Sequence, residues 1–431
     1  MRRLAVLGGV SIALVAAAAC AVSEDVSSPP HEEPEQSIPD ADVREVAVGS
    51  DAPAPTRGLL CSSDGWCETL LPDPDLVVRD IWPFSDRAFA IAESFTSGIK
   101  VLEWTSTDST WRYIDDNSQN EALAELAVGI WAPSADEVYY AVSPGTIYRG
   151  TRPVAPATAW SWSSERLPDN NPANVNHGDA TQRRLTLGVW GTGSDDVYAW
   201  YSNTIFHRKS EGGGAPAWVP ELIADDFDAP DEHIFITGAA GKSPNDVWFA
   251  GSRRRGTKEP CDVLVRKTPE GYRRIADGVV PELYSDPCTA REGIPQVVGG
   301  PRAWPRKFQS LDGERFFALK SWNNFLRIEP DGDGYSVNIA NVPKTLLDAP
   351  NLISLWGESE DRLWLGSTFF NSNRGVVVRG SQVWGDGGVY EYSSIALNGA
   401  PSNGPPNQIR GTSNTNLWAV GDRYALHKTT P

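Results

Sequence analysis

One phrase recurs along most of the chain, and it is clearest as GVWGTGSDDVYAWYSNTIFHR at 188–208. It consists of a Trp-Gly opening, an acidic turn, a strand centred on an aromatic residue, and a further strand that ends in a basic residue. Seven copies align on the central aromatic residue, at spacings of 47 to 69 residues. The aligned residues are Phe89, Tyr139, Tyr198, Trp248, Phe317, Trp364 and Trp418.

Each copy carries the signals of four short strands. A turn rich in Asp, Asn and Ser precedes the aromatic strand, and such side chains bond their own backbone in tight turns. An apolar and then basic strand follows, as at 205–208, and after it a weaker strand led by an aromatic residue such as Trp162. Four strands in about fifty residues are typical of one propeller blade, which must stack on its neighbours. We therefore predict an all-β fold, a seven-bladed β-propeller with four-stranded antiparallel blades, over residues 58–431.

The seventh copy shows only three strand signals. An aromatic-led stretch, Trp66 to Leu71, stands before the first copy and resembles the missing strand. We expect this N-terminal strand to pair with the last blade and close the ring, because closure removes exposed strand edges.

The first 57 residues do not resemble the repeats. Arg2 and Arg3 precede an apolar segment, 4–18, which is the pattern of a signal peptide and is too short to span a membrane. The sequence Ala17-Ala18-Ala19-Cys20 resembles a bacterial lipobox, so we expect residues 1–19 to be removed and Cys20 to be lipidated; an ordinary signal-peptidase site at the same alanines is the alternative. Residues 21–57 carry nine Asp or Glu against two Arg. Residues 20–57 are therefore predicted to form a disordered, acidic, Pro-rich tether.

Four further cysteines suit an exported chain, which meets an oxidising compartment. Three pairings of Cys61, Cys67, Cys261 and Cys288 are possible, and we favour the local ones, Cys61 with Cys67 and Cys261 with Cys288. The first of these would staple the closing strand. A zinc site is the alternative, but the sequence has no CxxC spacing and its histidines are scattered. No metal and no cofactor are predicted.

The net charge of −18 argues against a nucleic-acid partner, which requires clustered Lys and Arg. The one basic run, 253–255, is predicted to be a solvated hairpin tip in the fourth blade, with a local anionic contact as the alternative. The acidic stretches 225–232 and 331–334 do not fit a calcium-loop pattern, and we interpret them as an inter-blade loop and a hairpin turn. The sequence has no GxSxG motif, and His207 and His427 occupy the basic position of the repeat. No catalytic residue is predicted.

The phrase WG-x-x-x-x-D-[VL]-[WY]-A-x-G, seen at 190–199, 356–366 and 411–421, resembles the repeat of exported β-propeller lipoproteins of high-GC bacteria. The resemblance covers residues 58–431. It implies shape and location rather than activity. The implied location is the cell envelope, with a lipid anchor as the membrane contact. Ala21 after the cysteine favours the outer membrane; a soluble secreted or periplasmic protein is the alternative.

Two function classes remain open. The preferred one is a membrane-tethered binding scaffold for an envelope or extracellular protein or glycan, presented by long insertions such as 166–187 and 278–306. The alternative is a propeller lyase or glycosidase with its site at the central channel. That reaction needs acidic or His side chains from several blades at the axis. Asp195 and Asp361 are candidates, but they lie in the repeated turn, which favours a structural role.

Overall fold

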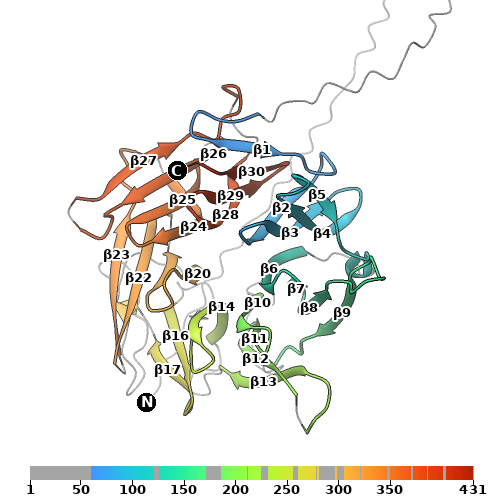
Figure 1. Ribbon diagram of the computed structural model, residues 1–431. Helices are drawn as coiled ribbons and strands as arrows, with labels where there is room; N and C mark the ends of the chain where they lie inside the picture. Colours follow the sequence, from blue (N-terminus) through green and yellow to red (C-terminus); the bar gives the residue numbers. More distant parts are fainter. Residues whose placement is uncertain are drawn as a thin grey trace, which may run out of the picture. The chain divides into compact units, whose positions relative to one another are not determined.

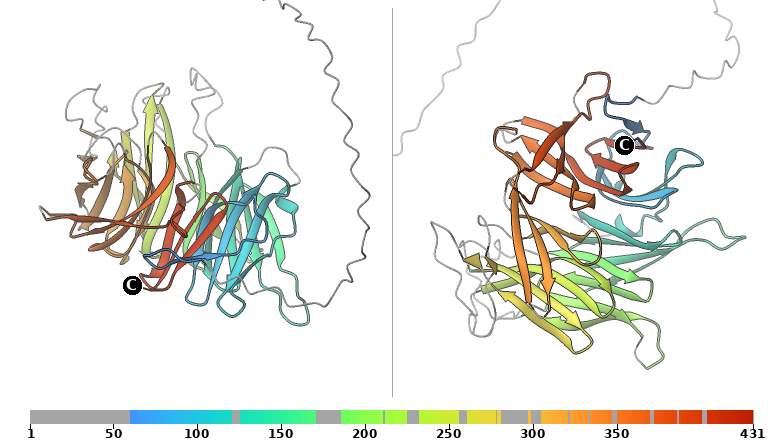
Figure 2. Two further views of the ribbon diagram at one scale, coloured as in Figure 1. Left: turned by 90° about the horizontal axis from the view of Figure 1, so that it is seen from above. Right: turned by 60° about the vertical axis from the view of Figure 1, so that its left-hand side comes forward.

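The computed structural model describes residues 60–430 except 121–125, 171–185, 211, 225–231, 256–260, 278, 281–296, 299–304, 321, 333, 347–349, 370–371, 386 and 401–403. Seven antiparallel sheets of four strands each lie in a ring (Figure 1), which confirms the predicted seven-bladed β-propeller. Figure 2 shows the same sheets side by side from two other directions. In the described part of the chain the regular structure other than strand is one short 3-10 helix, η1 (Ser118–Asn120). The predicted signal peptide, Cys20 and the predicted tether lie outside the described residues.

The blades follow one another in chain order. Blades one to four contain β2 (Val77–Pro83), β3 (Arg87–Ser94), β4 (Gly98–Thr105) and β5 (Thr110–Tyr113); β6 (Leu126–Ser134), β7 (Glu137–Ser143), β8 (Thr146–Thr151) and β9 (Ser161–Arg166); β10 (Leu187–Gly193), β11 (Asp196–Tyr201), β12 (Thr204–Lys209) and β13 (Ala217–Ile223); and β14 (Glu232–Ser243), β15 (Asp246–Arg255), β16 (Cys261–Thr268) and β17 (Gly271–Asp277). Blades five and six contain β20 (Arg306–Ser310), β21 (Phe316–Lys320), β22 (Asn324–Asp331) and β23 (Gly334–Asn341); and β24 (Pro350–Ser359), β25 (Arg362–Phe369), β26 (Ser372–Ser381) and β27 (Val389–Ser393). Blade seven contains β28 (Pro406–Ser413), β29 (Asn416–Gly421), β30 (Tyr424–Lys428) and β1 (Trp66–Thr69); a parallel pair, β18 (Val279–Val280) and β19 (Val297–Val298), lies between blades four and five.

The ring closes as predicted, with the first strand of the chain completing the last blade. β1 pairs antiparallel with β30, in a register that places Trp66 opposite Lys428 and Thr69 opposite Ala425. The Thr69 hydroxyl donates to the Ala425 carbonyl oxygen at 2.8 Å. Closure therefore fixes the N-terminal end of the ring to its last strand.

The hydrophobic core lies between the sheets rather than at one centre. Among the described residues seven buried clusters occur, one at each junction of neighbouring blades. The seven aligned aromatic residues of the repeat are at most 2 % exposed and contribute to these clusters. Each blade is thus covered by its two neighbours, as the repeat pattern requires.

The basic position of the repeat has a structural explanation. The aromatic residue of the second strand lies directly opposite the basic residue of the third, as Trp248 lies opposite Arg266 in blade four. The residue two places earlier lies on the same face because strand side chains alternate. In blade four this residue is Asp246, which accepts hydrogen bonds from the Trp248 indole at 2.9 Å and from Arg266 at 2.7 Å. We call this arrangement the repeat triad.

Four other blades keep the repeat triad in modified form. Blade one exchanges the charges, since Arg87 and Glu103 take the two positions and pair at 3.1 Å. The members in blades two, three and seven are Glu137, Tyr139 and Arg149; Asp196, Tyr198 and His207; and Asn416, Trp418 and His427. His207 and His427 therefore stabilise blades, which agrees with their repeat position.

Candidate functional site

The predicted cysteine pairs meet different outcomes. Cys61 and Cys67 form a disulfide, as predicted, which links Cys67 of β1 to the segment before this strand. Cys261 is disulfide-bonded, but Cys288 lies outside the described residues, so their pairing stays a prediction. Cys20 also lies outside them, and its lipidation stays a prediction.

The basic run 253–255 was predicted wrongly. It lies within β15, and the Arg253 side chain is 1 % exposed instead of solvated at a tip. Arg253 forms an ion pair with the buried carboxylate of Asp277, which Arg274 also contacts at 2.8 Å. Arg253 on β15 and Asp277 on β17, the two strands that flank β16, thus compensate each other inside the blade, and consecutive arginines alone do not reveal such a partner.

Asp195 and Asp361, the acidic candidates for a channel site, lie exposed in turns between the first and second strands of their blades. Asp331 and Gly334 close the hairpin of β22 and β23, as expected for that turn. The long insertions 166–187 and 278–306 lie mostly outside the described residues. The described residues contain no cluster of His, Cys, Asp or Glu suited to a metal ion. Nor do they contain a helix long and apolar enough to cross a membrane.

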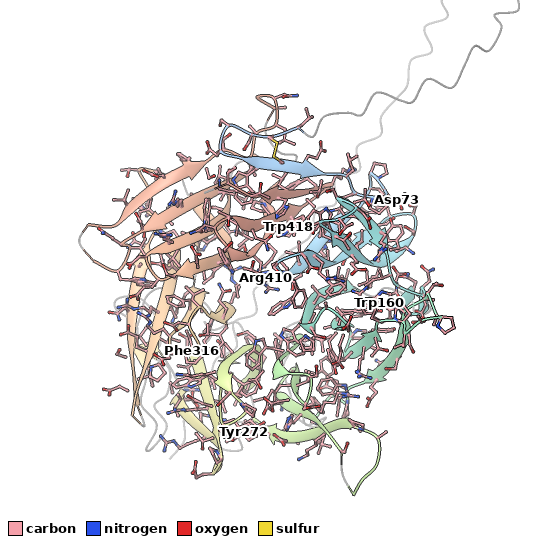
Figure 3. The ribbon with its side chains drawn as sticks, in the orientation of Figure 1. Asp73, Trp160, Tyr272, Phe316, Arg410 and Trp418 are labelled. Atoms are coloured by element: carbon pink, nitrogen blue, oxygen red, sulfur yellow. A yellow bond between two sulfur atoms is a disulfide. The ribbon has the colours of Figure 1, made fainter. Side chains whose placement is uncertain are left out.

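A polar cluster near the ring axis is the strongest candidate site. The first strands of the blades contact one another around the axis, and register shifts occur within β2, β6, β14, β20, β24 and β28. Such bulges re-aim side chains that a regular strand would direct to its two faces. Five residues of three of these strands form the axial cluster: Asp80, Arg306, Lys307, Gln408 and Arg410. Figure 3 shows Arg410 near the centre of the ring.

Lys307 lies in the bulge of β20 with a φ of 53°, a left-handed conformation that costs a non-glycine residue energy. Its ammonium group reaches past blade six and donates to the Gln408 side-chain oxygen at 2.6 Å. Burial lowers the pKa of Lys307, and the neighbouring charges of Arg410 and Arg306 lower it further, although Asp80 opposes them. The bulge therefore places the Lys307 amino group beside the two arginines, against the cost of strain and desolvation.

Asp80 and Arg410 join three blades at the same place. The Asp80 carboxylate accepts the Ile130 backbone N–H of blade two at 3.1 Å and lies 3.3 Å from Arg410 of blade seven. Gly129 leaves room for it, since a Cβ there would lie 3.2 Å from a carboxylate oxygen. The Arg410 guanidinium also stacks over Trp82 at 4.7 Å and donates to the Ile81 carbonyl oxygen at 2.8 Å.

The axial cluster carries three cations and one carboxylate. Asp80 neutralises Arg410, while Lys307 forms no ion pair with any described residue and bonds neutral oxygens of Gln408 and Asn407. Lys307 and Arg306 are half-buried, so water reaches them. This arrangement suits an anionic group, because partly buried cations bind carboxylate, sulfate or phosphate more strongly than fully exposed ones and water access leaves room for the ligand.

No protein-family model and no curated protein sequence matches the chain. Among solved structures, the chain is similar to YCF48 bound to a D1 peptide, at 11 % identity and a TM-score of 0.51, covering 86 % of this chain and 98 % of that one. It is also similar to a polysaccharide lyase, an ulvan lyase bound to a saccharide, at 10 % identity and a TM-score of 0.46, covering 86 % of this chain and 95 % of that one. The likeness to YCF48 concerns the fold alone and agrees with a β-propeller.

Sequence reasoning did not find the axial cluster. Lys307 follows Arg306 in a copy without the Trp-Gly opening, and Arg410 takes the place of the Trp before Gly411 in the seventh copy, so neither residue was recognised as part of a site. A usable signal was the irregular first strand of the fifth copy, which has no Trp-Gly opening.

Proposed function

We propose that this propeller is an envelope-tethered binding module that holds an anionic group of a protein or glycan partner at the axial cluster. The observation that carries the proposal is the convergence of Arg306, Lys307 and Arg410 from β20 and β28 near the axis. The whole chain has a net charge of −18, so a local excess of positive charge stands out and would select its partner.

The enzyme alternative has less support from the same residues. A lyase or glycosidase needs a pair of acid and base groups that reach the substrate. The one carboxylate of the axial cluster, Asp80, already accepts two backbone N–H groups and faces Arg410. Such a carboxylate is held in place by its partners, which suits a structural clamp better than proton transfer.

The membrane-tethering part of this proposal rests on the sequence of residues 1–57. A lipidated Cys20 would hold the ring at the membrane surface by an acidic linker, and the ring would meet partners in the envelope or outside the cell. The propeller YCF48 was solved with a peptide, so this fold is compatible with a peptide partner. Labelling with a palmitate analogue tests the anchor: it should mark the wild type and spare Cys20→Ser.

Binding to two polyanions tests the axial site. The probes are poly-L-glutamate and polygalacturonate, which represent acidic protein and acidic glycan partners, with neutral dextran as the blank. The double variant Arg306→Gln/Lys307→Gln should bind at least about a hundredfold more weakly, because two charge-assisted hydrogen bonds are lost and each contributes about 1.5 to 3 kcal/mol. Lys242→Gln is the control, since this exposed lysine pairs with Glu314 and does not belong to the axial cluster.

The result expected for the wild type is binding that weakens as salt rises from about 0.05 to about 0.5 M. Preference for one polymer assigns the partner class. Equal affinity of the wild type and the double variant, with unchanged circular dichroism, would overturn the axial site, as would failure of both polymers to bind.

A further inference from the structure

Blade six breaks the repeat triad. The acidic position holds Arg362, so the blade presents two arginines around Trp364. Arg379, opposite Trp364, stacks over the indole at 5.8 Å. In blade five, by contrast, Arg315 and Arg327 both pair with Glu360, at 2.6 and 2.5 Å. Arg379 is exposed and forms no ion pair with any described residue, so its charge remains available.

A cavity of about 560 Å³ lies beside Arg379, where the outer strands of blades six and seven meet. We call it the seam cavity. Its lining is mostly polar and combines charged groups, hydroxyl groups and aromatic rings. The residues used below are Asp64, Arg379, Glu391, Tyr392, Lys428 and Thr430. This volume is within the range of small-molecule sites.

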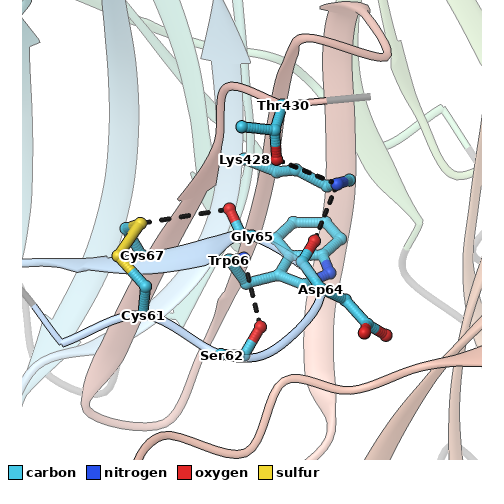
Figure 4. The surroundings of a disulfide bond; sticks show 8 residues. All are labelled: Cys61, Ser62, Asp64, Gly65, Trp66, Cys67, Lys428 and Thr430. Carbon is cyan, nitrogen blue, oxygen red and sulfur yellow. Dashed lines mark hydrogen bonds between the residues drawn. A yellow bond between two sulfur atoms is a disulfide. The ribbon is translucent and has the colours of Figure 1, made fainter.

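The turn before β1 forms one wall of the seam cavity and is held in several ways (Figure 4). The Cys61–Cys67 disulfide closes it. Asp64 accepts the Ser394 backbone N–H at 2.5 Å, and the Asp64 carbonyl oxygen accepts from the Lys428 ammonium at 2.7 Å. Gly65 has a φ of +80°, and a Cβ there would lie 2.1 Å from the Thr430 hydroxyl oxygen. The wall is therefore pre-formed.

The seam cavity is lined by two cationic side chains, Arg379 and Lys428, and by the carboxylates of Asp64 and Glu391. Burial lowers the pKa of Lys428, and the charge of Arg379 also lowers it, whereas Asp64 acts in the opposite direction. Two cations thus lie close enough to repel, and a carboxylate between them would relieve that repulsion. Glu391, exposed and opposite Arg379 in the sheet register, is an acceptor for hydroxyl groups.

The remaining lining suits a polyhydroxylated molecule. The Tyr392 ring is 49 % exposed and offers an apolar face to C–H groups. The hydroxyl of Thr430 and those of Ser62, Ser63 and Ser393 lie around the same space. We propose that the seam cavity is a binding site for a small acidic sugar, whose carboxylate contacts Arg379 and Lys428 and whose hydroxyl groups contact Glu391 and the neighbouring side-chain hydroxyls.

This site is separate from the axial cluster. The seam cavity lies at the outer strands of blades six and seven, and it shares no residue with the axial cluster. The two proposals therefore fail independently: substitution at Lys307 leaves the seam cavity unchanged, and substitution at Arg379 leaves the axial cluster unchanged.

Titration calorimetry with D-glucuronate tests the seam cavity. We expect Arg379→Gln to weaken glucuronate binding by about tenfold or more and Arg379→Lys to restore part of it, since one charge-assisted hydrogen bond is lost and then regained. Arg362→Gln is the matched control, because it removes the same charge from the same blade outside the cavity lining. Wild-type glucuronate affinity is expected for this control.

Glucose and L-glutamate test the recognition of the carboxylate and of the hydroxyl groups separately. Both should bind more weakly than glucuronate, because glucose has no carboxylate and glutamate has no hydroxyl groups. Glutamate binding as tightly as glucuronate would overturn the sugar assignment, and equal glucose binding would overturn the role of Arg379. Absence of glucuronate binding to the folded wild type, or its persistence in Arg379→Gln, would overturn the site.

Discussion

Trp66 is the main link between the closing strand and the ring, and its removal tests closure most directly. The side chain is fully buried in the cluster between blades six and seven. Its ring meets Trp364 edge to face at 5.8 Å, and its indole N–H donates to the Ser393 hydroxyl at 2.9 Å. Trp66→Ala removes both contacts and leaves a cavity, so we expect a loss of about 3 to 5 kcal/mol in the free energy of unfolding.

Trp66→Phe separates the contribution of the hydrogen bond from that of the aromatic packing. It keeps an aromatic ring but removes the hydrogen bond to Ser393, and we expect a loss of about 1 to 2 kcal/mol. The measurement is urea unfolding followed by circular dichroism and by fluorescence, whose transitions must coincide for a single free energy to be defined. Leu70→Ala is the control in the same segment. Leu70 is 52 % exposed, so the change should stay within about 0.5 kcal/mol.

A loss of less than about 1 kcal/mol in Trp66→Ala would contradict the burial of this side chain, since removing a fully buried indole costs several times as much. A cost equal to that of Leu70→Ala would show that β1 is not required for the stability of the ring.

Three further predictions concern buried charge, acidity and the disulfide. Burial lowers the pKa of His427 to about 4, below its ordinary 6.5. As the pH drops from 6.5 to 4, His427 is therefore protonated in the unfolded chain but not in the folded one. We expect the free energy of unfolding to fall by about 2 to 4 kcal/mol over this range. His427→Gln should flatten that part of the urea-midpoint profile, and an unchanged slope would contradict the assignment. Arg253→Met should cost about 3 to 5 kcal/mol because it leaves Asp277 buried with Arg274 alone; a neutral result in thermal unfolding would show that the pair contributes nothing. The double variant Cys61→Ser/Cys67→Ser opens a loop of sequence separation 6 and should lose about 2 kcal/mol in urea, and full stability would argue against the staple.

The propeller fold was predictable because every copy of the repeat carries the same local sequence pattern. Each copy places an aromatic residue such as Trp248 in its second strand and a turn before it, and these signals need no partner from elsewhere in the chain. The closing strand was also predictable, since Trp66 supplies the aromatic lead that the seventh copy lacks. The reversal in blade one, with Glu103 at the basic position, explains why that copy departs from the pattern without losing the ion pair.

The candidate sites could not be predicted in this way. Lys307 meets Gln408 across the ring, 101 residues away, and the seam cavity joins Asp64 to Arg379. Contacts of this kind depend on β-bulges and on the order of the blades, and the sequence pattern of one repeat contains neither. Arg253 shows the same limit, because its burial depends on a carboxylate on another strand.

The pairing of β1 with β30 has a consequence for how the protein is made. Trp66 emerges early from the ribosome, whereas its partner Lys428 emerges more than three hundred residues later. During that interval blades one to six can form in order, but the waiting strand has no sheet to join. A ribosome that stops before residue 424 releases an open arc with two unprotected edges, which quality-control proteases and chaperones would recognise.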